Sequence, residues 1–239
     1  MKHAQALSDN ELLGEFLHAD CSAWMNQLEA VVMPLGMTLC APGQGSDYVY
    51  FPTTAIVSLS CLTQSGGSAE VAAVGRDGVV GVSALMGGGT ASWGAVTQIA
   101  GLGFKLPTQV LKAKFNAGGM VMEVTLRYLK SLIGQISQTA VCNRYHSVDH
   151  QVCRWLLNAM DRLPGNEVMV THELIAKALG VRREGVTESA LKLQRVGVIH
   201  YARGHITVTD RRRLERCACE CYGVFAHWRV RLQPELLAA

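Results

Sequence analysis

One stretch near the C-terminal end constrains the fold of this chain most. Residues 172–179 carry apolar side chains at helical spacing, Gly180 follows, and a second helical stretch runs to Val196. The Thr171 hydroxyl can cap the first helix, and Gly180 suits a turn that needs a positive φ. The stretch therefore predicts a helix, a turn and a second helix. Ala176 is small where the helices cross, and the apolar wedge between them is formed by Ile175, Leu179, Val181 and Val186.

The second helix of this pair opens with charged residues. In a helix–turn–helix the N-terminal part of the second helix enters the major groove of duplex DNA, where Arg suits guanine and Glu suits cytosine. An ordinary helical hairpin with a charged face is the alternative, and we favour DNA binding because all the spacing demands are met together. The expected DNA-contacting residues of this segment are Thr171, His172, Arg182, Arg183, Glu184, Thr187, Glu188 and Lys192.

A β-hairpin is predicted directly after the second helix. Residues 197–209 hold two short apolar runs around Arg203, Gly204 and His205. Such a hairpin is a wing, and we expect Arg203 and His205 to contact phosphate. Asp210 then caps a last helix whose first turn, residues 211–213, is all Arg. Positive charge there is unfavourable, so either an anion or solvent is expected to face it.

The charge of the chain is distributed unevenly. Residues 1–147 hold 8 Lys and Arg against 9 Asp and Glu, whereas residues 148–239 hold 14 against 10. A neutral first part followed by a basic last part is typical of a C-terminal domain that binds a polyanion. A solvated basic face would give the same count, so the charge supports the helix–turn–helix assignment without establishing it.

The N-terminal part has the pattern of a small β domain. Fourteen of the 24 glycines fall between residues 31 and 107, where they divide short apolar runs such as residues 56–61. Many short strands separated by turn signals predict a sandwich or barrel. A short helix is expected before it, because Ser8 and Glu11 form a capping-box pattern ahead of apolar residues.

A long helix is predicted for residues 119–145, which contain no Pro and one interior Gly. Its apolar residues step by 4 and 3, the spacing of a coiled-coil seam, over roughly 30 Å. A second apolar line, beginning at Val121, lies beside the seam, so one face can pack on the β domain while the seam meets a partner. A buried core helix would also need two lines, and that alternative stays open. The seam residues are Met122, Leu126, Leu129, Ile133, Ile136, Ala140 and Asn143.

These elements predict an α+β chain in three parts. Residues 1–118 form a β jelly-roll or barrel, and residues 119–147 form the dimerisation helix and hinge. Residues 148–239 form a winged helix–turn–helix domain.

At this point the chain resembles the Crp–Fnr family of bacterial transcription regulators. The resemblance rests on the order of the elements and on residues 171–188, 193–199 and 201–206, which match the DNA-binding motif of the family closely. It implies a homodimer on a near-palindromic operator in double-stranded DNA, with RNA polymerase and an unknown small-molecule effector as further partners. By that analogy Arg183, Glu184 and Glu188 fall on base-reading positions and Thr171 on a phosphate-contacting one. Glu188 replaces the basic residue of the cyclic-AMP receptor protein.

The resemblance implies that residues 1–118 are the sensor domain, and this domain departs from the nucleotide-binding members of that family. Val82 stands where a Glu is expected, and no Arg occurs between Arg76 and Arg127. A buried phosphate without a cationic partner is costly, so we expect no cyclic-nucleotide binding of the usual kind. An N-terminal Cys cluster for an iron–sulfur centre is also missing, since only Cys21 lies near that end.

Eight cysteines without an export signal predict reduced thiols in a cytoplasmic protein. On one helix Cys217 and Cys221 would share a face and Cys219 would not, so a metal site there needs unwinding or outside ligands such as His227. We expect small buried or reactive thiols, and keep a thiol- or metal-based stress sensor using Cys217, Cys219 and Cys221 as the alternative function.

The remaining function classes are disfavoured. The 239 residues are 49% hydrophobic and 17% charged, which excludes disorder as the main state, and no apolar run is long enough to cross a membrane. No His occurs between His18 and His146, so the β domain lacks the usual ligands of jelly-roll metal enzymes. Neither a nucleophile elbow nor a phosphate-binding loop is present. We therefore expect a non-enzyme without a cofactor.

Overall fold

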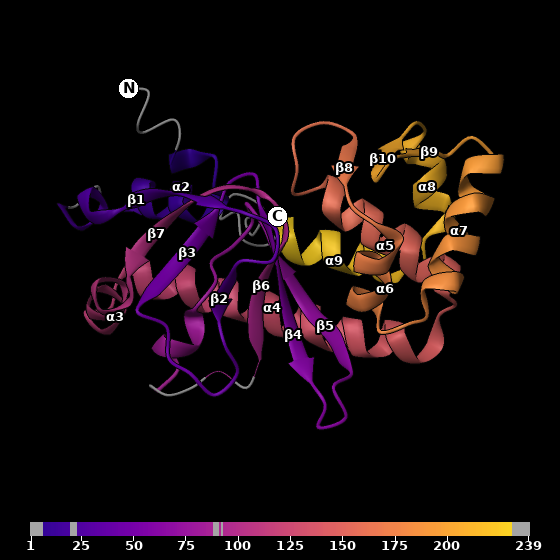
Figure 1. Cartoon of the computed structure of the whole chain (residues 1–239). Helices are drawn as coiled ribbons and strands as arrows, with labels where there is room; N and C mark the ends of the chain where they lie inside the picture. The colour runs from indigo at the N-terminus through magenta and orange to yellow at the C-terminus, as the bar shows by residue number, and fades with distance from the viewer. Residues whose placement is uncertain (1–6, 20–22, 88–90, 92, 231–239) are drawn as a thin grey trace.

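The computed structural model describes residues 7–19, 23–87, 91 and 93–230. Figure 1 shows two N-terminal β-sheets, a long helix that runs beside them, and a group of C-terminal helices with a small third sheet. This is the α+β architecture that the sequence predicts. No helix of the described part is long and apolar enough to span a membrane.

The N-terminal domain packs two antiparallel sheets face to face. One sheet has the order β1-β7-β3 and the other β2-β6-β4-β5. Phe51, Val57 and Leu106 are among the side chains buried between them, which explains the alternating apolar pattern of these segments. The strands are β1 (Glu29–Met33), β2 (Thr38–Cys40), β3 (Tyr48–Pro52), β4 (Ile56–Leu62), β5 (Ser68–Val74), β6 (Gly94–Ile99) and β7 (Gly101–Pro107), with short 3-10 turns η1 (Ala23–Gln27) and η2 (Val82–Leu85).

The predicted N-terminal helix is present as α2 (Glu11–Ala19), but its cap differs from the expected one. The Asn10 side-chain oxygen accepts a hydrogen bond from the Leu13 amide at 3.0 Å. The Asn10 amide group also donates to the carbonyls of Pro52 (2.8 Å) and Gly78 (2.9 Å). Asn10 rather than Ser8 therefore caps α2, because its fully buried amide also joins the helix to the end of β3 and to the loop after β5.

Helix α4 (Met120–Tyr145) confirms the predicted long helix almost to the residue, after the short α3 (Thr108–Asn116). Its inner line of Val121, Val124, Tyr128 and Leu132 is buried in the core of the N-terminal domain. The Tyr128 hydroxyl donates to the Val79 carbonyl at 2.9 Å. The other line of α4 faces outward for much of its length.

The C-terminal domain begins at Ser147, whose hydroxyl caps α5 (Val148–Met160). The core of the domain lies between α5, the two helices that follow and a three-stranded sheet of order β8-β10-β9. The remaining elements are β8 (Glu167–Met169), α6 (His172–Leu179), α7 (Arg183–Arg195), β9 (Ile199–Ala202), β10 (His205–Val208), α8 (Arg211–Cys217) and α9 (Cys221–Val230).

The two domains are joined by a buried ion pair that the sequence did not reveal. Arg162, just after α5, donates to Asp77 through Nη2 at 2.9 Å and through Nε at 3.0 Å. Both side chains are at most 8% exposed. Gly75 leaves room for this contact, because a Cβ there would lie 2.8 Å from the Arg162 side chain. Helix α6 also packs against β5, so the C-terminal domain rests on the edge of the four-stranded sheet.

Candidate nucleic-acid interface

Helices α6 and α7 form the predicted helix–turn–helix. The Thr171 hydroxyl accepts from the Leu174 amide at 3.2 Å and caps α6. Gly180 ends α6 with φ 67°, and the Val181 amide then donates to the Ala176 carbonyl at 3.1 Å. The apolar wedge is packed as expected, with Ile175, Ala176, Leu179 and Val186 at most 6% exposed.

The N-terminal end of α7 presents its charged residues to solvent. Arg182, Arg183 and Glu184 are all exposed, whereas Val186 and Leu193 on the opposite side are buried in the domain core. In Figure 1, α7 lies at the end of the molecule far from the N-terminal sheets. The N-terminal end of α7 is therefore open to solvent.

His172 does not belong to this exposed surface, contrary to the sequence expectation. It is 8% exposed, and its ring stacks on Tyr201 with centroids 4.3 Å apart. The Thr187 hydroxyl donates its one proton to the Arg183 carbonyl at 3.1 Å. The same hydroxyl lies 3.1 Å from His172 Nδ1, so in that contact Nδ1 must be the donor. Burial, together with the charge of Arg183, lowers the pKa of His172 and favours the neutral ring. The ring contacts Thr187 of α7 on the buried side of that helix.

The later residues of the exposed α7 face are already paired. Lys192 Nζ lies 3.1 Å from both Asp149 Oδ2 and Glu188 Oε1, and these hydrogen bonds raise the pKa of Lys192. Asp149 lies in the first turn of α5, so its ion pair with Lys192 links α5 to α7. Any contact of Glu188 or Lys192 with DNA would require these ion pairs to break.

The wing is present as the hairpin of β9 and β10, extended by β8. Arg203 at its tip is exposed and adopts φ 51°. His205 Nδ1 lies 2.6 Å from Glu167 Oε1 on β8 and is partly exposed. Arg203 is thus the wing residue most available to phosphate, while His205 is held by a neighbouring carboxylate.

Two of the three arginines at the start of α8, Arg211 and Arg213, bind groups of their own domain. Asp210 caps the helix by accepting from the Arg213 amide at 2.9 Å. Arg211 donates to Asp161, Glu215 and the Tyr222 hydroxyl, and Arg213 donates to the Val196 carbonyl. All three side chains are nevertheless exposed, as expected of a solvated face, and Arg211 and Arg213 bind groups of their own domain at the same time.

A comparison with protein families decides the class of this domain. Residues 150–217 match the family described as the Crp-like helix-turn-helix domain. The chain carries a Crp-like helix-turn-helix domain. With the fold, this match confirms the resemblance to the Crp–Fnr family, whose members are DNA-binding transcription regulators.

Solved structures of other proteins have the same fold over most of the length of this chain. FixK2 from Bradyrhizobium japonicum superimposes with a TM-score of 0.67 at 16% identity, covering 80% of this chain and 98% of that one. A putative Crp/Fnr regulator from Eubacterium rectale has a TM-score of 0.62 at 18% identity, covering 88% of this chain and 93% of that one. A Crp-family regulator from Thermus thermophilus has a TM-score of 0.64 at 21% identity, covering 80% of this chain and 96% of that one. No curated protein matches the chain.

The predicted dimer seam on α4 is only partly at the surface. Leu126 and Ile133 are 47% and 58% exposed, and Ala140 and Asn143 are exposed too. Leu129, in contrast, is 7% exposed and belongs to the core of its own domain. The prediction that Leu129 belongs to the seam is therefore wrong. The predicted line of residues runs along the border between the buried and the exposed face of α4, and Leu129 lies on the buried side. Met122 and Ile136 lie at that border, partly buried.

Proposed function

We propose that this chain is a homodimeric, sequence-specific regulator that reads a near-palindromic operator with α7. The observation that carries the proposal is the exposure of Arg182, Arg183 and Glu184 at the N-terminal end of α7 while the opposite side of that helix is packed. Arg side chains at this position suit guanine O6 and N7, and Glu suits cytosine N4.

The outer face of α4 supports the dimer. Leu126 and Ile133 are large exposed apolar residues seven positions apart, and Ala140 continues the same line by another seven. Apolar side chains at this repeat pack well against a second copy of the same helix. Two copies joined in this way would present two recognition helices to successive major grooves, roughly 34 Å apart.

The proposal includes no cyclic nucleotide as the effector. Val82, which replaces the expected Glu, is 3% exposed and packs in the core of the N-terminal domain. An apolar side chain in that place offers no hydrogen bond to a nucleotide. The expected effector is therefore either a different small molecule or none.

Selection of bound sequences from a random duplex pool tests the proposal, and a two-fold symmetric consensus is the expected result. Arg183→Ala should then weaken binding to the selected site by roughly 1–3 kcal/mol and leave non-specific binding largely intact. Arg195→Ala is the matched control, because Arg195 is an exposed Arg in the last turn of the same helix. An equal loss on all sequences with Arg183→Ala would refute base reading by this residue.

A further inference from the structure

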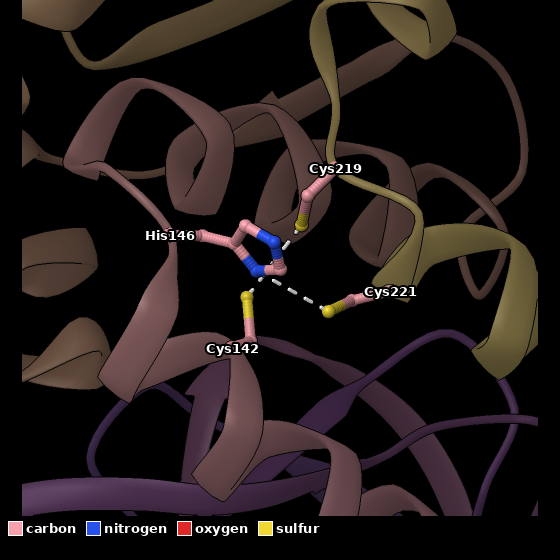
Figure 2. A group of neighbouring side chains, drawn as sticks. All are labelled: Cys142, His146, Cys219 and Cys221. Carbon is pink, nitrogen blue, oxygen red and sulfur yellow. Dashed lines mark hydrogen bonds between the residues drawn. The ribbon is translucent and has the colours of Figure 1, made fainter.

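Four side chains with metal-binding atoms meet where the long helix enters the C-terminal domain. Cys142 and His146 lie one turn apart at the end of α4, and Cys219 and Cys221 lie at the junction of α8 and α9 (Figure 2). Their three sulfur atoms and one ring nitrogen all lie within 4.8 Å of one another. Cys142 Sγ is 3.6 Å from Cys219 Sγ, and Cys221 Sγ is 3.4 Å from His146 Nδ1.

The separations of 3.6 Å between Cys142 and Cys219 and 3.4 Å between Cys221 and His146 are close to the edges of a zinc tetrahedron. Zn–S bonds of about 2.3 Å and Zn–N bonds of about 2.0 Å place neighbouring ligand atoms roughly 3.5–3.8 Å apart. Three thiolates and an imidazole are also a ligand set that zinc takes in structural sites, where all four positions are filled by protein. Hydrophobic packing alone does not explain why one imidazole nitrogen points into a group of three sulfurs.

The backbone bends to bring Cys219 into the group. Helix α8 ends at Cys217 and α9 begins at Cys221, although the intervening residues Ala218, Cys219 and Glu220 include neither Gly nor Pro. A continuous helix would place Cys219 away from Cys221. The sequence expectation is thus modified: Cys217 stays outside the group, and the outside ligands come from the end of α4. His227, the other outside ligand considered, has its side chain outside the described residues.

The surroundings of the group suit a bound cation. His146 Nε2 lies 3.3 Å from Glu220 Oε1, so a proton on Nε2 leaves Nδ1 free to bind a metal. The Gln138 side-chain amide donates to Cys221 Sγ at 3.0 Å. Three thiolates around a divalent ion carry a net negative charge, and the buried Arg154, 6% exposed, acts electrostatically on Cys142. Cys142 and Cys221 themselves are fully buried.

We propose that Cys142, His146, Cys219 and Cys221 bind one Zn²⁺ in a closed tetrahedral site. The ion would fasten the start of α9 to the C-terminal end of α4. Since the hinge between α4 and α5 follows His146 directly, the site would also restrict how the C-terminal domain turns relative to α4.

Metal analysis of the full-length protein, purified with reductant, tests the site. One equivalent of zinc per chain is expected, and Co²⁺ exchanged into the site should give the thiolate-to-cobalt charge-transfer bands of a tetrahedral complex. Cys142→Ser and Cys219→Ser should each lose the zinc and weaken these bands. Cys217→Ser is the matched control, because Cys217 lies two residues from Cys219 but outside the group, and it should keep both signals.

Wild-type protein that takes up neither zinc nor cobalt overturns the proposal, as does metal binding that survives in both Ser variants. A Cys142–Cys219 disulfide in reductant-free protein, without metal, would point instead to a redox pair and also overturn it. Because the wild-type cobalt titration decides without any variant, a variant that fails to fold leaves the proposal testable. None of these measurements uses DNA, so their failure is separate from failure of the proposed function.

Discussion

The ion pair between Asp77 and Arg162 makes a quantitative prediction about how the two domains are held together. The carboxylate accepts two hydrogen bonds from the guanidinium, and Asp77 Oδ1 also accepts from the Gly75 amide at 3.0 Å. Arg162 further donates to the Asn158 carbonyl at 3.1 Å. Burial alone would disfavour the charge on Arg162, yet its pKa is raised, because Asp77 and other nearby carboxylates outweigh the lost hydration.

Replacing Asp77 by Ala should therefore be costly. Removing one partner of a buried pair leaves the other charge uncompensated, which costs about 3–5 kcal/mol. Arg162→Leu in the same chain removes that stranded charge, and the double variant should recover much of the loss, because apolar replacement of a whole buried pair is often neutral. The free energy of unfolding, from urea titration of the wild type, both single variants and the double variant, measures this coupling.

A second readout keeps the assay valid if the domains separate before either unfolds. Hydrogen exchange of the amides of α6 and β5, which pack on each other, should rise in Asp77→Ala before exchange in the domain cores does. A loss of stability below about 1 kcal/mol in the single variant would refute the reasoning. So would a double variant whose loss equals the sum of the two single losses, since that means no coupling.

Two further predictions concern the proposed dimer and the support of α7. Leu126→Glu with Ile133→Glu should give a monomer of normal stability in sedimentation, whereas Leu129→Glu should unfold the N-terminal domain; a persistent dimer in the first would contradict the seam. His172 has a folded-state pKa below its ordinary value of about 6.5. Its stabilisation is complete above that pH and falls as the pH drops below it, because the unfolded chain takes up the proton first. His172→Phe should flatten this fall in urea titrations at pH 5–7, and an unchanged slope would contradict it.

Patterns that depend on neighbours in the chain predicted the structure well. Thr171 and Gly180 have their roles through contacts within five residues, so the helix–turn–helix and its bounds were visible in the sequence. The bounds of α4 were visible for the same reason. Which residues of the outer α4 line face solvent was not, because that depends on how the β domain sits against the helix. Ser8 and Asn10 are both good caps, and only the distant carbonyls of Pro52 and Gly78 select Asn10.

Contacts between distant segments were missed for a physical reason. Asp77 and Arg162 are 85 positions apart, and Cys142 is 77 positions from Cys219. Single charges and single thiols carry no periodic signal that would indicate a partner. The one available hint was His146 four residues after Cys142, a spacing that puts two metal-binding side chains on one helix face.

If the proposed zinc binds, it and the Asp77–Arg162 pair restrain the chain near the two ends of α5. The proposed zinc group lies beside the hinge that precedes α5, and the Asp77–Arg162 pair lies just beyond its C-terminal end. The helix between them has 13 residues, or roughly 20 Å. A contact near one end of α5 alone would let the C-terminal domain pivot about that contact, whereas contacts near both ends oppose this motion. If α4 sets the dimer, the spacing of the two α7 helices depends on this restraint. A signal that changed either contact would therefore act on DNA binding without approaching α7.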